Sequence, residues 1–209
     1  MSKFIVKFVE KKGGAGSGHH GHAGRPGKRG GSLPGKSGVS ISARNSDEEA
    51  MLQHVTAEAK LRSSHIRGTS FPEHLLNHAR FFNPPSDDSE LPEWCVQGEM
   101  KQCYLNSITG LMGAPDDVYY TEGYAFVDGL TGFPIQHGWL TTSNGDVIDP
   151  TWRDNKGVVY YGIRYNRDYV MDVVYETEMA GILVNDYLTG SKIAKLGFPA
   201  GALVDESTD

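Results

Sequence analysis

Long apolar runs and a dense cysteine framework are both missing from this chain of 209 residues. No stretch approaches the ~18 consecutive apolar residues that a membrane span needs, and residues 1–9 are too short and too charged for a secretory signal. The two cysteines, Cys95 and Cys103, do not resemble the framework of a small secreted protein. We therefore expect no membrane span and no signal peptide. A Cys95–Cys103 disulfide stays open, and it would disable Cys103 as a nucleophile.

Nucleotide-binding glycine signatures are also lacking, because neither a P-loop nor a dinucleotide fingerprint follows a predicted strand. Aromatic residues are absent from residues 13–38, although residues 1–40 carry eight Lys and Arg against one acid, a net +7 that leaves the rest at −13. Without aromatic side chains to stack on bases, a solvated basic linker is favoured over a nucleic-acid-binding arm.

Glycine dominates residues 13–38, with 11 Gly and almost no apolar side chains. This composition cannot offset the entropy of ordering, so we predict a disordered linker over residues 13–45. A short strand over residues 3–9 precedes it and is expected to dock on a protein partner. The three histidines of the linker lack Cys or acid partners, which favours a solvated tract and predicts no metal site. They are His19, His20 and His22.

The run GSGHHGHAGRPGKRGGS resembles linkers in structural and head-morphogenesis proteins of tailed bacteriophages and prophages. The resemblance covers about 20 residues of low complexity. It implies a location in a virion or in the cytoplasm of a bacterial host.

Two helices are expected ahead of the main domain. Ser46, with Glu49 three residues later, has the spacing of a capping box and predicts a helix to about Ser63 that packs weakly on the domain or on a partner. A second helix is expected from Pro72 to Phe82. The chain is thus divided into a strand (1–12), a linker (13–45), a helical segment (46–90), an α+β domain (91–200) and a frayed tail (201–209).

Cys103 opens the run CYLNSITGLM, in which Leu105, Ile108 and Met112 have helical spacing. A cysteine at a helix N-terminus faces unpaired N–H groups that favour the thiolate, although a lone cysteine is more often a small core residue. Gln97 lies six residues earlier and is a candidate donor to an oxyanion, together with the backbone N–H of Cys103.

His137 and Asp149 lie on two strand-like runs joined around Asn144 and Gly145. A two-residue turn would place Asp149 on the face opposite His137. A three-residue loop with a left-handed Gly145 instead pairs Trp139 with Asp149, diagonal to His137 on the same face, and we favour this register. Asp149 would then orient the imidazole while His137 takes the thiol proton. Asp146 and Asn106 are the alternative orienting residues.

The order Cys103, His137, Asp149 over residues 97–152 resembles the papain-like and transglutaminase-like cysteine enzymes. The spacing of Gln97-Gly98 to Cys103 resembles the papain pattern, whereas His137-Gly138-Trp139 and Asp149-Pro150 resemble the transglutaminase strands. The sequence departs from papain in that Tyr104 follows the cysteine. The resemblance implies an α+β fold with an antiparallel sheet packed against the helix that carries the catalytic cysteine.

The remaining strands are expected at 119–126, 158–165 and 169–175, followed by a covering helix at 176–188. Tyr104, Tyr124 and Trp139 are candidate substrate contacts, although aromatic residues on strands more often pack in the core. Glu122 is expected to satisfy a polar neighbour, and Trp152 to pack around the strand of His137.

Two functions remain open. The first is a thiol-dependent acyl-transfer enzyme without a cofactor: a peptidase, amidase, deamidase or transglutaminase that acts on a protein or peptide. Its nucleophile, base, orienting residue and oxyanion donor would be Cys103, His137, Asp149 and Gln97. The alternative is a non-catalytic phage structural or interaction protein in which the domain is a binding module.

Overall fold

The computed structural model describes residues 43–63, 68–86, 90–127, 133–152 and 157–205. The predictions for the strand at 3–9, for the linker as far as residue 42 with its three histidines, and for residues 206–209 of the tail lie outside these residues. Within them the protein has the expected α+β fold, built on an antiparallel sheet whose strand order is β1-β5-β2-β3-β4. The strands are β1 (Arg80–Phe82), β2 (Val118–Val127), β3 (Ile135–Thr142), β4 (Val147–Ile148) and β5 (Gly157–Tyr165).

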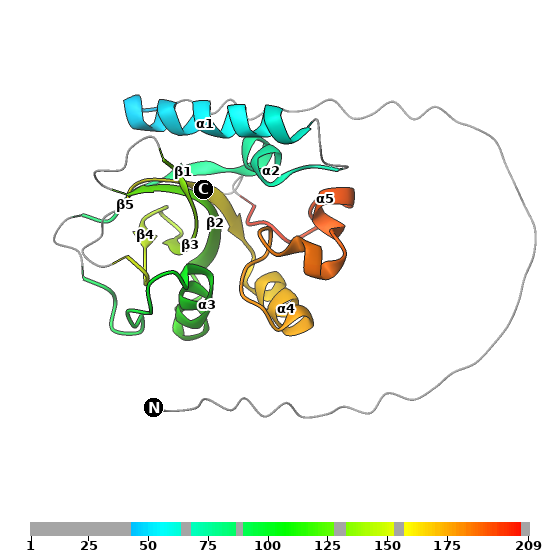
Figure 1. The fold of residues 1–209 in the computed structure, drawn as a ribbon. Helices are drawn as coiled ribbons and strands as arrows, with labels where there is room; N and C mark the ends of the chain where they lie inside the picture. Colours follow the sequence, from blue (N-terminus) through cyan, green and yellow to red (C-terminus); the bar gives the residue numbers. More distant parts are fainter. Residues whose placement is uncertain (1–42, 64–67, 87–89, 128–132, 153–156, 206–209) are drawn as a thin grey trace, which may run out of the picture. The chain divides into compact units, whose positions relative to one another are not determined.

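The sheet curls until its two edges meet (Figure 1). At the end of β1, the N–H of Asn83 donates to the carbonyl of Gly145 at 2.9 Å, and the N–H of Val147 in β4 donates to the carbonyl of Asn83 at 3.0 Å. The curl encloses one face of the sheet, where residues from all five strands pack together. This inner cluster consists of Phe82, Ala125, Trp139, Val147 and Tyr160.

The outer face of the sheet carries the larger core, which the helices cover. Figure 1 shows α1 (Ser46–Ser63) and α2 (Phe71–His78) on one side of the curled sheet and α3 (Cys103–Gly113) on the other. The chain continues after β5 into α4 (Arg167–Thr177), a 3-10 turn η2 (Asp186–Thr189) and α5 (Lys192–Leu196). Met51, Val55 and Leu75 lie in the same cluster as Leu111 and Tyr161, so this core draws on residues on both sides of residue 91.

The helix predicted from Ser46 to Ser63 is confirmed, but its cap differs. Asn45, not Ser46, accepts the N–H groups of Asp47 and Glu48 through its side chain, at 3.1 and 3.0 Å. The capping box occurs instead at α2, between Ser70 and Glu73. The predicted second helix is too long, because α2 ends at His78 and the chain then extends into β1.

Two predictions after β5 are wrong. The strand expected at 169–175 is helix α4. Asn166 caps its N-terminus, where the Asn166 side chain accepts the N–H of Asp168 at 3.0 Å. The helix expected at 176–188 does not form, since Glu178 takes a left-handed conformation (φ 55°) and ends α4. Tertiary contacts decide both outcomes. In α4, Val170 and Val173 are buried in the core. Further along, the backbone N–H groups of residues 182–184 bind a buried carboxylate.

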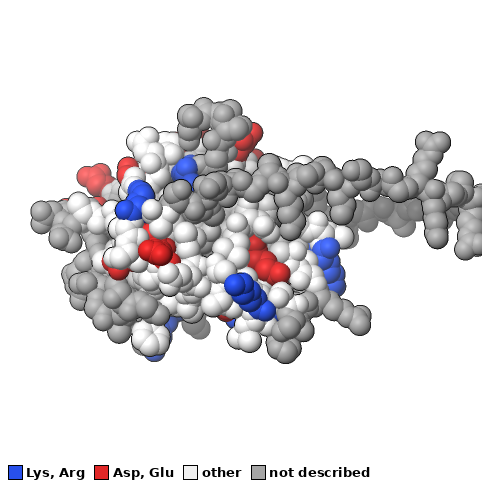
Figure 2. Space-filling model, turned by 90° about the horizontal axis from the view of Figure 1, so that it is seen from above, with Lys and Arg blue, Asp and Glu red and all other residues white. Residues whose placement is uncertain are grey.

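On the face seen in Figure 2, basic and acidic side chains are scattered among neutral residues. Among the described residues, no helix has the length and apolar character to cross a membrane.

Candidate active site

Cys103 is the first residue of α3, as the sequence predicted, and its side chain is almost fully buried. The apolar face predicted for this helix is wrong in part, because Leu105 and Met112 are 51% and 65% exposed while Ile108 and Leu111 face the core. Cys103 and Cys95 are both free thiols, so the two do not form the disulfide that would disable the site. Burial, with the nearby charge of Asp149, raises the pKa of the Cys95 thiol to about 11.

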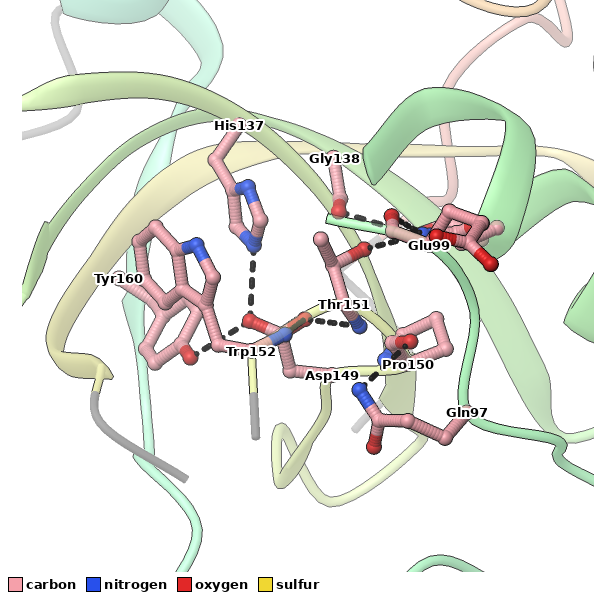
Figure 3. A network of polar contacts seen from close by, with 11 residues as sticks. Gln97, Glu99, His137, Gly138, Asp149, Pro150, Thr151, Trp152 and Tyr160 are labelled. Carbon is pink, nitrogen blue, oxygen red and sulfur yellow. Dashed lines mark hydrogen bonds and ion pairs between the residues drawn. The ribbon is translucent and has the colours of Figure 1, made fainter. Parts of the chain in front are cut away.

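His137 and Asp149 form a buried pair in which Nε2 of His137 lies 2.7 Å from Oδ2 of Asp149 (Figure 3). The favoured hairpin register is confirmed: Leu140 pairs with Ile148 and Thr141 with Val147, which sets Trp139 opposite Asp149. Gly145 has φ 87°, the left-handed conformation that the three-residue loop needs. This register differs by one residue from that of a two-residue turn, and it therefore places the side chains of His137 and Asp149 on the same face of the sheet.

The carboxylate of Asp149 is held by four donors. Oδ1 accepts the N–H groups of Thr151 and Trp152 at 2.9 and 3.2 Å, and Oδ2 accepts the Tyr160 hydroxyl at 2.9 Å in addition to His137. Burial acts to raise the pKa of this carboxyl, but the charge and hydrogen bond of His137 and the two backbone N–H groups lower it below its usual value. Asp149 is therefore fixed in place as an anion.

The ring of His137 is clamped between its acid partner and an aromatic side chain. Trp152 stacks on it with centroids 3.9 Å apart and planes 9° from parallel. Burial acts to lower the pKa of His137, but the charge and hydrogen bond of Asp149, with the hydrogen bond and charge of Cys103, raise it to about 9. Because Asp149 holds Nε2, Nδ1 is the ring nitrogen left for Cys103. The imidazole is thus bonded to the carboxylate, and the thiol is near enough to add to its pKa shift.

The short length of β4 lets the helix reach the strand of His137. β4 pairs only with Leu140 and Thr141, so the edge of β3 at Gly138 is not covered by β4. There the hydroxyl of Ser107 in α3 donates to the carbonyl of Gly138 at 2.9 Å. A Cβ on Gly138 would lie 2.8 Å from Cδ1 of Tyr104, so this glycine permits the close approach of α3 to β3.

Gln97 lies beside the loop that carries Asp149 (Figure 3), where its Nε2 donates to the carbonyl of Pro150 at 3.1 Å. The N–H of Gly98 donates to the same carbonyl at 2.7 Å. One amide N–H of Gln97 is engaged in this contact, and the Nε2 group carries a second.

The alternative orienting residues have other roles. Nδ2 of Asn106 donates to the carbonyl of Glu99 at 2.8 Å and to the Thr151 hydroxyl at 2.9 Å, so it ties the segment before α3 to the Asp149 loop. Asp146 is exposed in the hairpin and accepts from the side chain of Asn83 at 3.2 Å. Asp149 is the residue that orients His137.

The candidate substrate contacts are only partly at the surface. Trp139 is fully buried in the inner cluster and Tyr124 is 3% exposed with its hydroxyl bonded to Glu58, so both predictions of substrate contact are corrected to core packing. Tyr104, which follows Cys103 in the chain, is half-buried and lines a surface groove with Leu105 and Met179.

Sequence reasoning missed the contribution of Tyr160, which reaches Asp149 from β5. In the sequence, the only signal for this contact is the alternation of side chains along the strand, which turns Tyr160 to the inner face. Glu122 was expected to satisfy polar neighbours, and it does: it accepts the Tyr120 hydroxyl at 2.7 Å and three backbone N–H groups.

Compared with protein-family models, curated proteins and solved structures, the chain gave no match. Within the described part of the chain, no group of three or more His, Cys, Asp or Glu side chains is arranged to hold a metal ion.

Proposed function

We propose that the protein is a thiol-dependent acyl-transfer enzyme in which Cys103 is the nucleophile, His137 the acid and base, and Asp149 the orienting carboxylate. The observation that carries this proposal is the buried pair of His137 and Asp149, with Nε2 and Oδ2 2.7 Å apart, beside a cysteine that begins α3 and helps to raise the pKa of His137. A protonated imidazole beside a thiol at a helix N-terminus is the arrangement that favours attack by sulfur.

The reaction proceeds in two halves. With the thiol proton on His137, the sulfur of Cys103 attacks the carbonyl carbon of an amide. His137 then gives that proton to the departing amine as the C–N bond breaks and a thioester forms. In the second half His137 takes a proton from water or from an entering amine, which attacks the thioester and restores the thiol. Water gives peptidase, amidase or deamidase activity, whereas an amine gives transglutaminase activity.

The papain-like and transglutaminase-like architecture belongs to this proposal. Its support is the arrangement of a cysteine at the start of a helix, a histidine on an antiparallel strand and an acid directly after the next strand. Gln97 is the proposed oxyanion donor through its second amide N–H, with the backbone N–H of Cys103. The substrate class is an amide or isopeptide bond in a protein or peptide.

Alkylation by iodoacetamide at pH 6 tests the nucleophile. We expect Cys103 to react at least about tenfold faster than free cysteine, whose pKa is ~8.5, and His137→Ala to lose this advantage. His54→Ala is the matched control, because His54 is an exposed histidine on α1. Cys95 is an internal control that stays unlabelled, since burial raises its pKa to about 11.

The peptide that carries the label is identified by mass spectrometry of the native protein. Equal and slow rates in the wild type and in His137→Ala would contradict the proposal. Cys103 would then be a structural cysteine, and the non-catalytic interaction protein would become the better account.

A further inference from the structure

The edge of β4 that faces away from β3 begins a parallel ladder with the end of β1. Asn83 and Asp146 form a parallel bridge there, and the N–H of Val147 donates to the carbonyl of Asn83 at 3.0 Å. In a continued parallel ladder, the N–H of residue 85 would donate to the Val147 carbonyl, and the N–H of Asp149 would donate to the carbonyl of residue 85. These two bonds are the next that the edge of β4 offers.

Proline stops this ladder. Residues 84 and 85 are both prolines, so residue 85 has no N–H to donate to Val147. Asp149 precedes Pro150, which favours an extended backbone, and its N–H therefore lies on the same edge as the carbonyl of Val147. Among the described residues, no hydrogen bond to this carbonyl or to this N–H is found. An acceptor and a donor are thus left unpaired side by side.

A hollow of about 370 Å³ lies along this edge. Residues 146–149 form one wall, and residues 84–86 and 90–92 form the other. Its size falls within the range of roughly 300–1,000 Å³ that is usual for ligand sites. The chain after β1 therefore leaves space beside β4 instead of filling it, and an unpaired strand edge is a template for another strand. We call the hollow and its two unpaired backbone groups the β4 edge site.

The lining of the β4 edge site combines negative charge with apolar surface. Glu90 and Asp146 are both exposed, and within the described part of the chain neither forms an ion pair. Asp146 has only the neutral side chain of Asn83 as a partner, at 3.2 Å. Leu91 and Ile148 add half-buried apolar side chains. These features fit an extended segment in which Lys or Arg alternates with apolar residues.

A second copy of this chain fits the β4 edge site less well. Pairing two such edges would bring the carboxylates of both copies into one interface, and like charges repel. The charge of the lining therefore favours a basic partner over self-association.

We propose that the β4 edge site binds an extended basic segment of a partner protein, which adds to the sheet as a further strand. The backbone of the segment donates an N–H to the Val147 carbonyl and accepts the N–H of Asp149. Its Lys or Arg side chains lie at Glu90 and Asp146. This docking goes beyond the proposed reaction, because it requires no step at Cys103.

NMR titration with the peptide acetyl-Val-Lys-Val-Lys-Val-amide tests the proposal. The full chain carries Cys103→Ser, so that the probe stays intact. We expect the amide signal of Asp149 to shift and its hydrogen exchange to slow at least about tenfold, because its N–H becomes bonded. The N–H of Val147 is the internal control, since it is already bonded to Asn83 and should change little.

Two N-methylated forms of the peptide test the strand geometry. Methylation of the Lys residues alone or of the Val residues alone removes the N–H groups of one strand edge, because successive N–H groups point to opposite edges. We expect one form to bind at least about tenfold more weakly than the parent peptide and the other to bind like it. Each form thus serves as the control for the other.

Charge is tested with the double variant Glu90→Gln and Asp146→Asn. We expect it to bind the peptide at least about threefold more weakly at low ionic strength. Both side chains are exposed, so the substitutions remove no core packing. Asp172→Asn is the matched control, since Asp172 is an exposed acid on α4 and should leave the affinity unchanged.

Several outcomes would overturn the β4 edge site. They are a parent peptide that does not bind at millimolar concentration, two N-methylated forms of equal affinity, and a double variant that binds like the wild type. A dimer of the free chain on sedimentation that the peptide disperses would assign the edge to a second copy. The iodoacetamide rates of the wild type test the proposed function separately, so either proposal can fail without the other.

Discussion

The ionisation of His137 depends on two effects of opposite sign. The side chain is 1% exposed, and burial alone would keep the ring neutral. The carboxylate of Asp149, itself held by Thr151, Trp152 and Tyr160, reverses this, so the ring is protonated at neutral pH. A buried charge of this kind persists only because its partner is fully hydrogen-bonded.

The His137 ring should titrate near pH 9 when followed by NMR of the labelled imidazole. Asp149→Asn should lower this midpoint by at least 2 pH units, roughly 3 kcal/mol, because burial is then opposed only by the smaller contribution of Cys103. His78 is the internal control, since burial lowers its pKa and it should titrate below 6.5 in both proteins. A His137 midpoint near 6.5 in the wild type would contradict the buried ion pair.

The same shift links His137 to stability. Its folded pKa lies above its unfolded value of 6.5, so the pair stabilises the fold fully below pH 6.5 and loses this contribution as the pH rises through about 9. For Asp149 the folded pKa is lowered, so its contribution is present above 3.8 and is lost as the pH falls through the folded value.

At the scale of elements, the position of Cys103 depends on how α3 docks on β3. The contact is close because Gly138 has no side chain and because Ser107 binds the Gly138 carbonyl. β4 ends after two residues, which leaves this stretch of the β3 edge to the helix. The proline after Asp149 has no N–H to extend a ladder.

Gly138→Ala should push Tyr104, and with it the first turn of α3, away from β3. We expect a loss of about 1–3 kcal/mol in the free energy of unfolding by urea, and iodoacetamide labelling of Cys103 slower by roughly tenfold to a hundredfold. Gly113→Ala is the matched control at the other end of α3, where a Cβ would meet the Trp94 carbonyl at an ordinary 3.5 Å. Equal effects of the two substitutions would show that the docking distance does not matter.

At the scale of the whole molecule, the described residues share a core that the first helices help to build. Met51 and Val55 of α1 and Leu75 of α2 are completely buried, and β1 closes the curl of the sheet against the hairpin that carries the catalytic pair. The described residues of α1, α2 and β1 therefore stabilise the shape of the site, and none of them hydrogen-bonds to His137 or Asp149.

A fragment of residues 91–209 should not fold, whereas residues 43–209 should. Each buried side chain of this kind contributes about 1.5–3 kcal/mol, so losing three of them together with β1 removes most of the stability of an ordinary domain. Circular dichroism and amide NMR dispersion would check this. A shorter fragment with the same dispersed spectrum as the longer one would show that the core after residue 91 is sufficient.

The sequence by itself determined the local features: the helix that begins at Cys103, the strands around His137, and the left-handed glycine that sets the hairpin register. These follow from short-range rules, namely hydrophobic period, turn chemistry and the alternation of side chains along a strand. The register mattered most, since one residue decides whether Asp149 and His137 share a face.

Only the tertiary structure decided which of several plausible polar and aromatic residues serve the site. Trp139 became core because the sheet curls around it, and Tyr160 reached Asp149 because β5 crosses the same inner face. Residues 169–175 became a helix because their apolar side chains meet the core at helical spacing, against their strand propensity. These outcomes depend on contacts between residues distant in the chain, and no local pattern encodes such contacts.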